Sequence, residues 1–367
     1  MKPAAARMEF LDSIRGLASV AVLLSHSFIF EWPDAVYRFI NLPMVNLAFN
    51  GKEAVAMFFV LSGYVLSRPY FADAATGRPA RNFFLPSFYA RRFTRIWLPW
   101  FFVFGLSAAA QFFLFRDWRT SPPMNDWAGG FWHIPLTAEN FLRQCLFMEH
   151  DPRVQLLNQD WSLGIELKAS VLMPLLILLV SGWRLGCLLA VSAGLPYFFG
   201  ADIFYVSFIL GILLARYSQP LLAGLRPQPV AVKVGVLLAG LGLYQAFQIL
   251  GAGNVSCLMT SLGCGLIILA TLASDRLQAL LHWRPVVFLG RISYSIYLLQ
   301  FIVILCVLPP WVHWLNAHGI TGTASLLPLS LAMSVGGTVL LAALNYRWVE
   351  KPCLQLGGWL SKKMQRE

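Results

Sequence analysis

Apolar runs of roughly 16 to 22 residues recur along the whole chain, and this feature constrains its fold most strongly. A run of that length crosses the hydrocarbon core of a bilayer as a single α-helix. Charged residues make up only 12% of the 367 residues, whereas a soluble protein has about 25%. The sequence therefore predicts an all-α fold, a polytopic integral membrane helix bundle of about ten transmembrane helices.

The predicted spans lie near residues 14–31, 51–68, 96–115, 162–181, 184–199, 201–216, 230–250, 254–273, 287–309 and 325–346. Most of the 28 Lys and Arg residues fall in alternate connecting segments or at the neighbouring helix ends. Because cytoplasmic loops carry the excess of basic residues, this bias predicts that both termini are cytoplasmic. We expect a multi-pass protein of the cytoplasmic (inner) membrane, with residues 1–352 as one transmembrane domain and 353–367 as a short basic tail.

The net charge of +11 is explained by these short basic loops, so no nucleic acid partner is expected and the lipid bilayer is the surrounding partner. The six histidines and six cysteines show no spacing typical of metal ligands, so no metal is expected.

One long extracytoplasmic segment is predicted, over residues 116–160. It carries Trp118, Trp127 and Trp132 and an amphipathic stretch at residues 138–148. Two interpretations are open. A long loop in a compact protein is often a lid or a binding element, and tryptophans also form belts at the membrane interface.

The first predicted span contains an arginine and a histidine, Arg15 and His26. Their separation of eleven residues is within about 20° of three full helical turns and rises about 16 Å, so both lie on one face. Ionisable groups are costly within a membrane and usually mark a functional site. The alternatives are an arginine that extends its charge to the interface and a histidine that is hydrogen-bonded to a neighbouring helix.

The fourth predicted span begins with QDWSLGIELK at residues 159–168. If Trp161 marks the outer interface, Glu166 lies about 7 to 8 Å deeper, at a depth similar to that of His26. A carboxylate and an imidazole at one depth suggest a shared polar cavity, although helix neighbours cannot be identified from sequence.

Arg92 and Arg95 in FYARRFTRIWLP (88–99) are i, i+3 neighbours at the predicted cytoplasmic entry of the third span. Arg15 is expected at the same level. Guanidinium groups bind phosphate through paired donors, so a phosphate site is one interpretation of these arginines. Ordinary positive-inside charge is the alternative.

Several motifs together resemble the membrane-bound acyltransferase 3 family. They occur in the family's order: FLDSIRGLASVAVLLSH (10–26), MFFVLSGYVLSRPYF (57–71), FYARRFTRIWLP (88–99), DWSLGIELK (160–168), LGRISYSIYLLQF (289–301) and NYRWVEKP (345–352). The family transfers acyl groups onto hydroxyls of sugars and other extracytoplasmic acceptors.

The resemblance implies roles for individual positions. It assigns the family's Arg-x10-His pair to Arg15 and His26 with Asp12 before it, the RxxR motif to Arg92 and Arg95, and the tryptophan–serine–leucine motif to Trp161, Ser162 and the following Glu166. The family commonly has a histidine where this chain has Gln300, and Gln300 is a further candidate for a supporting role.

The residues and the resemblance together predict an O-acyltransferase without a bound cofactor. Acyl-coenzyme A is the expected co-substrate, with acetyl as the expected acyl group, and Arg15, Arg92 and Arg95 would hold its phosphates. His26 would act as general base and Glu166 would orient it, although a covalent acyl-histidine is also open. The acceptor is expected to be a carbohydrate or another hydroxyl compound, and candidates for the oxyanion donors are Ser62, Tyr64 and Ser162. A transporter or flippase for a lipid-linked or acylated sugar is the alternative, which the missing internal repeat disfavours.

Overall fold

The computed structural model of the chain describes residues 8–75, 85–134, 136–147, 151, 153–180, 184, 204–251 and 253–365. Across these residues the regular structure is helical, and the one pairing of extended backbone is an isolated antiparallel bridge between Phe30 and Met124. The predicted all-α fold class is confirmed for the described part of the chain.

Seven segments among the described residues are helical and apolar over a length sufficient to cross a membrane. They comprise α4 (Gly51–Ala75), α5 (Leu85–Phe113), α8 (Asp160–Leu179), α10 (Tyr205–Leu225), α13 (Asn254–Ala273), α15 (Arg284–Cys306) with α16 (Leu308–Ala317), and α17 (Thr323–Asn345) with η1 (Tyr346–Glu350) and α18 (Lys351–Met364). The chain is therefore a polytopic helical membrane protein, as predicted.

The other predicted spans have different outcomes. The first is helix α1 (Glu9–His26), which carries three charged residues near its start and does not qualify by composition. The seventh is α11 (Val230–Tyr244), which is apolar but shorter. The fifth, at 184–199, lies outside the described residues except for Arg184, as does the start of the sixth. A count near ten and cytoplasmic termini thus stay predictions.

The chain divides into two compact units. The first unit comprises Met1–Ala18, Lys52–Phe83 and Lys168–Arg291, and the second comprises Ser19–Gly51, Phe84–Leu167 and Ile292–Glu367. The borders fall inside α1, α4, α8 and α15, so each of these helices contributes residues to both units.

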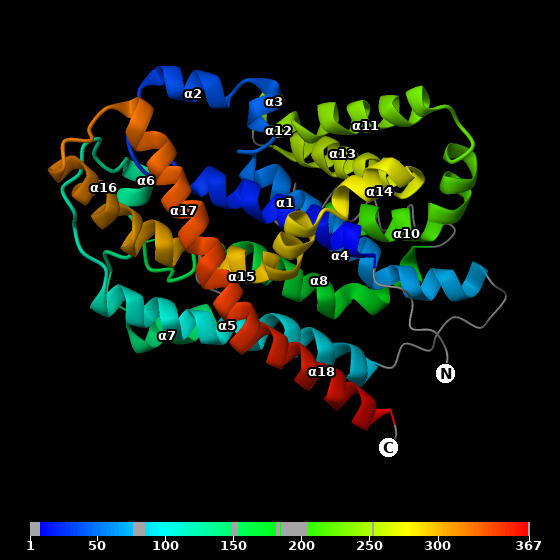
Figure 1. The fold of residues 1–367 in the computed structure, drawn as a ribbon. Coiled ribbons are helices and arrows are strands. Elements are labelled where there is room, and N and C mark those ends of the chain that lie inside the picture. The colour runs from blue at the N-terminus through cyan, green and yellow to red at the C-terminus, as the bar shows by residue number, and fades with distance from the viewer. Residues whose placement is uncertain are drawn as a thin grey trace. The chain divides into compact units, whose positions relative to one another are not determined.

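In the first unit, α4 and α10 cross with their backbones in close contact. A Cβ atom on Gly63 would meet the carbonyl oxygen of Phe208, and one on Gly211 would meet that of Val60. Small residues at such crossings let membrane helices pack tightly. In the same unit α11 lies beside α13 (Figure 1).

In the second unit, α18 packs along α5 (Figure 1). A Cβ atom on Gly357 of α18 would overlap the hydroxyl of Thr94, so the contact depends on the missing side chain. Arg91 Nη1 also donates to Ser361 Oγ at 2.7 Å. The stretch from residue 353, which we predicted to be a tail, is therefore helical up to Met364 and docks on α5.

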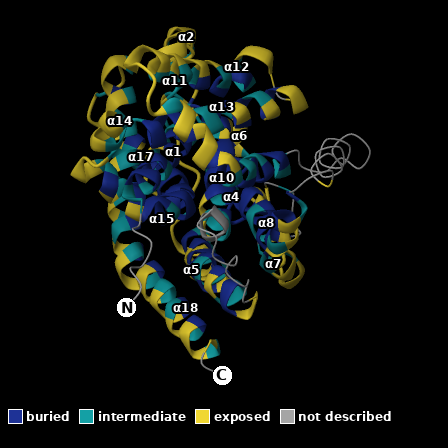
Figure 2. Cartoon of the chain, turned by 90° about the vertical axis from the view of Figure 1, so that its right-hand side faces the viewer, coloured by how far each residue is buried: buried dark blue, intermediate teal, exposed yellow. Residues whose placement is uncertain are grey.

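Burial differs sharply among the spans. The segment containing α15 is the most buried of the seven, and the run from α17 to α18 is the least buried. Figure 2 shows the same contrast, with buried residues concentrated on α15, α1 and α4 and exposed ones along α18. A helix buried all round is expected to carry polar groups that meet protein rather than lipid.

Candidate active site

Helix α1 ends at His26, earlier than the predicted end at residue 31. The Ser27 N–H donates to the carbonyl oxygens of Leu23 at 3.0 Å and Leu24 at 3.1 Å, which closes the last turn. The Ser27 hydroxyl lies 2.6 Å from that of Ser334 on α17. His26 is thus the terminal residue of its helix, and the prediction that the helix continues beyond it is wrong.

The residues after His26 are extended and pair with the loop at 123–125. The Glu31 N–H donates to the Pro123 carbonyl at 2.9 Å, and the Asn125 N–H donates to the Ile29 carbonyl at 2.8 Å. Asn125 Nδ2 also donates to the Phe28 carbonyl at 2.8 Å. These backbone groups need partners, and the loop supplies them in place of further helical turns.

The half-buried ring of His26 is held on several sides by residues of the second unit. Its Nδ1 lies 3.1 Å from Oε1 of Gln300 on α15. The indole of Trp127 stacks on it, with centroids 5.6 Å apart and planes 20° apart. The Phe301 ring packs against it at 5.0 Å. The imidazole is therefore fixed in position as well as in orientation.

Trp127 belongs to the short helix α6 (Asp126–Gly129), which Asn125 caps by accepting from the Ala128 N–H at 3.0 Å. Its side chain is 45% exposed, and Phe131 meets it edge-on at 4.8 Å. This part of the long loop is built around the histidine, which favours the binding-element interpretation.

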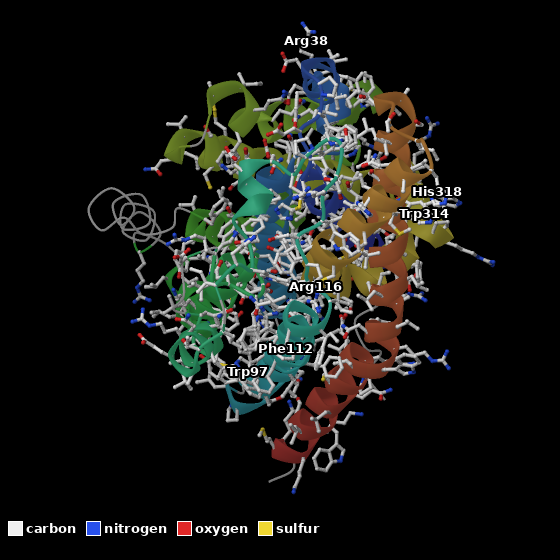
Figure 3. The ribbon with its side chains drawn as sticks, turned by 90° about the vertical axis from the view of Figure 1, so that its left-hand side faces the viewer. Arg38, Trp97, Phe112, Arg116, Trp314 and His318 are labelled. Atoms are coloured by element: carbon white, nitrogen blue, oxygen red, sulfur yellow. The ribbon has the colours of Figure 1, made fainter. Side chains whose placement is uncertain are left out.

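Other aromatic residues of the second unit lie away from His26. Trp118 packs on His313 of α16, with centroids 5.2 Å apart. Trp314 of α16 lies 4.1 Å, between centroids, from His318, which follows that helix, and Phe112 is exposed on α5 (Figure 3). For Trp118 the interfacial-belt interpretation stays a prediction. The predicted amphipathic stretch forms α7 (Ala138–Cys145).

Arg92 and Glu166 form an ion pair between α5 and α8. Arg92 Nη2 lies 2.9 Å from Glu166 Oε1, and the two side chains are 9% and 16% exposed. We had expected Glu166 to orient His26, but within the described residues the hydrogen bond of the His26 ring is made to Gln300. That expected contact is therefore not found, because similar depth in the membrane does not identify which helices are neighbours.

Arg92 and Arg95 lie about one turn apart on α5, which begins at Leu85. Their place at the cytoplasmic entry of the span stays a prediction. Arg92 is buried and Arg95 is half-buried. The positive-inside alternative describes charges in solvated loops. Arg92 differs from these because it is buried and paired with a carboxylate.

The start of α8 is fixed to two other helices of the second unit. Trp100 Nε1 of α5 donates to Asp160 Oδ1 at 2.7 Å. The Ser162 hydroxyl lies 2.5 Å from that of Tyr297 on α15. Gln159 Nε2 donates to the Tyr297 and Leu298 carbonyls, each at 2.8 Å. Trp161 is 40% exposed.

Sequence reasoning missed the roles of Asp160 and Tyr297 in this network, although both stand in the quoted motifs. It also missed a buried cluster in which Ser295 Oγ donates to Glu350 Oε2 at 2.6 Å and Asn345 Nδ2 donates to Ser295 Oγ at 2.9 Å. The available signal was their polarity within apolar runs.

Four candidates belong to the first unit: Asp12, Arg15, Ser62 and Tyr64. Arg15 and Asp12 are half-buried, and Tyr64 is almost fully buried in α4. The N-terminal part of α1 contacts α15 closely, because a Cβ on Gly290 would meet the Asp12 carbonyl. A shared location for Arg15, Arg92 and Arg95 stays a prediction.

Among the described residues, no three His, Cys, Asp or Glu side chains form a group able to hold a metal ion. The His26 ring is held by one hydrogen bond and by two aromatic rings. The fold places the chain in the class of polytopic helical membrane proteins.

The model of an acyltransferase domain, that of the acyltransferase 3 family, matches residues 8–343. The chain belongs to this family and is a membrane acyltransferase, as the sequence motifs predicted. Comparisons with curated proteins and with solved structures gave no match.

Proposed function

We propose that this enzyme transfers an acyl group, most simply acetyl, from acyl-coenzyme A at the cytoplasmic face to a hydroxyl of an extracytoplasmic or lipid-linked carbohydrate. His26 is the general base. The observation that carries this proposal is the environment of its ring: Gln300 binds one nitrogen, and Trp127 and Phe301 hold the ring plane.

The transfer balances as a single displacement. The acceptor hydroxyl oxygen attacks the thioester carbonyl carbon while His26 takes the hydroxyl proton. The tetrahedral intermediate then breaks its carbon–sulfur bond, and the imidazolium returns the proton to the departing thiolate. The products are an ester and free coenzyme A.

The donor side is assigned to the arginines. Arg92 and Arg95 offer guanidinium donors one turn apart on α5, and phosphates are bound well by such paired donors. Glu166 is a positioning residue for Arg92, because it holds that guanidinium at 2.9 Å in a nearly buried location. Arg15 is the third proposed donor ligand.

The spacing on α1 supports transfer across a distance. Arg15 and His26 lie eleven residues apart on this one helix, a rise of about 16 Å. In coenzyme A the extended pantetheine arm separates the phosphates from the thioester. It would span this distance if the phosphates lie near Arg15 and the thioester lies near His26.

The acceptor side is assigned to the loop around Trp127. A half-exposed indole beside the base offers a flat apolar face, and aromatic rings with polar surroundings are typical of sites that bind amphipathic small molecules. A sugar ring has apolar C–H faces and hydroxyls at its edge, so it suits this position.

The test is release of free thiol by the purified full-length protein supplied with acetyl-coenzyme A and a panel of mono- and disaccharides. Thiol release that requires an acceptor supports the proposal, and no release with any acceptor contradicts it.

A second donor, S-acetylpantetheine, has the thioester but no phosphates. Arg92→Gln should raise the KM for acetyl-coenzyme A about 100-fold and leave that for S-acetylpantetheine unchanged. An equal effect on both donors would contradict phosphate binding by Arg92.

A further inference from the structure

Gln300 is fully buried on α15 and uses both ends of its amide. Its Nε2 donates to the Tyr297 carbonyl at 2.9 Å, and its Oε1 lies 3.1 Å from His26 Nδ1. A backbone carbonyl can only accept a hydrogen bond. The amide nitrogen must therefore face Tyr297, and the amide oxygen must face His26.

This orientation determines which nitrogen of His26 carries the proton. An amide oxygen is an acceptor only, so His26 Nδ1 has to be the donor. A neutral imidazole has one N–H group, which leaves Nε2 with its lone pair. The tautomer is thus set by a chain of two hydrogen bonds that begins at a backbone carbonyl.

We propose that Gln300 is the positioning residue that fixes His26 in its Nδ1–H tautomer, so that Nε2 is the atom that takes the proton from the acceptor hydroxyl. This inference rests on the proposed role of His26 as general base. It assigns to an uncharged amide the orienting role that a carboxylate has in a Ser-His-Asp triad.

An amide in that role normally fails, because it can turn its NH2 group towards the histidine and impose the wrong tautomer. Here the Tyr297 carbonyl prevents the turn, since a flipped amide would set its oxygen against another oxygen. Gln159 Nε2, just before α8, donates to the same carbonyl at 2.8 Å, and this bond is separate from that of Gln300.

The amide differs from a carboxylate in one respect that matters for catalysis. It directs the ring without adding a full negative charge, so it stabilises the imidazolium less than an aspartate would. A neutral imidazole is the state that a general base requires.

The experiment is nitrogen NMR of the full-length protein carrying ¹⁵N-histidine, in detergent or nanodiscs. The His26 signals are identified by their loss in His26→Gln. The wild type should show the Nδ1–H tautomer. Gln300→Met has nearly the same volume but lacks the anchored acceptor, so it should shift His26 towards the Nε2–H tautomer.

Activity provides the second readout. Gln300→Met should lower kcat by about 10- to 100-fold, less than loss of the base itself, with both KM values within about twofold. Gln300→Glu is the rescue variant, because a protonated carboxyl group can donate its O–H to the Tyr297 carbonyl while its other oxygen accepts from Nδ1–H. It should retain the Nδ1–H tautomer and more activity than Gln300→Met.

Gln159→Met is the matched control. It removes two hydrogen bonds to the α15 backbone but does not contact His26, so the tautomer should stay as in the wild type. Unchanged signals from the other five histidines show that a variant is folded. If Gln300→Met is not folded, the comparison uses Gln300→Glu instead.

An Nε2–H tautomer in the wild type, or an unchanged tautomer in Gln300→Met, would overturn the inference. Full kcat in Gln300→Met despite a changed tautomer would also overturn it. Failure of the proposed function looks different: full turnover by His26→Ala would refute the general base while the NMR result still stood.

Discussion

Breaking the Arg92–Glu166 pair tests how the candidate site is connected. The N–O distance is 2.9 Å, and the side chains are 9% and 16% exposed, so the pair is largely shielded from water. Removing one partner of a buried pair leaves the other charge uncompensated, which typically costs about 3–5 kcal/mol. Glu166→Gln keeps one acceptor oxygen, so we expect a smaller cost of about 2 kcal/mol.

If that cost appears in donor binding, about 2 kcal/mol corresponds to an increase of about 30-fold in the KM for acetyl-coenzyme A. Because Glu166 is proposed to act through Arg92, the Arg92→Gln, Glu166→Gln double variant should be little worse than Arg92→Gln alone. Directly interacting residues show such non-additivity, with coupling energies of about 0.5–3 kcal/mol.

The assay is steady-state thiol release by the wild type, both single variants and the double variant, with a second cycle that combines Glu166→Gln with His26→Ala. Residual turnover in His26→Ala sets the baseline of that second cycle. Additive losses for Arg92 and Glu166, together with strong coupling between Glu166 and His26, would refute the proposed role and restore the triad-like arrangement expected from sequence.

Two further predictions follow from the packing. Trp127→Ala should raise the acceptor KM about tenfold and leave the donor KM unchanged. Trp118 lies in the same loop but packs on His313, so Trp118→Ala should change neither KM. Equal effects of the two variants would contradict an acceptor role for Trp127. The leucine side chain of Gly357→Leu should overlap Thr94 and destabilise the protein by about 1–3 kcal/mol. The measurement is the unfolding temperature in detergent, which should fall. An unchanged unfolding temperature would show that the packing of α18 does not depend on this contact.

The sequence predicted the seven spans found among the described residues, because the bilayer imposes a length and a composition that can be seen in one segment. It predicted the wrong end for α1 because residues 27–31, SFIFE, continue the apolar run. What stops the helix is hydrogen bonding to residues 123–125, and a partner so distant in the chain leaves no local signal.

The candidate site was predicted in its residues but not in its pairings. His26, Arg92 and Glu166 stood out as polar groups in apolar runs. Depth in the membrane could not show that α8 presents Glu166 to α5, or that Gln300 supplies the partner of His26. The sequence predicts Gln300 as a supporting residue and as a departure from the family pattern, but not as the partner of His26.

The most direct test of the account is transfer across a membrane by protein reconstituted in vesicles. Acetyl-coenzyme A with a labelled acetyl group is supplied at the cytoplasmic face, and a saccharide that supports thiol release is trapped on the opposite side. We predict labelled saccharide in the lumen with the wild type, and a rate lower by about 10²- to 10⁴-fold with His26→Ala at equal insertion. Equal labelling by His26→Ala, or labelling only of saccharide on the donor side, would contradict the account.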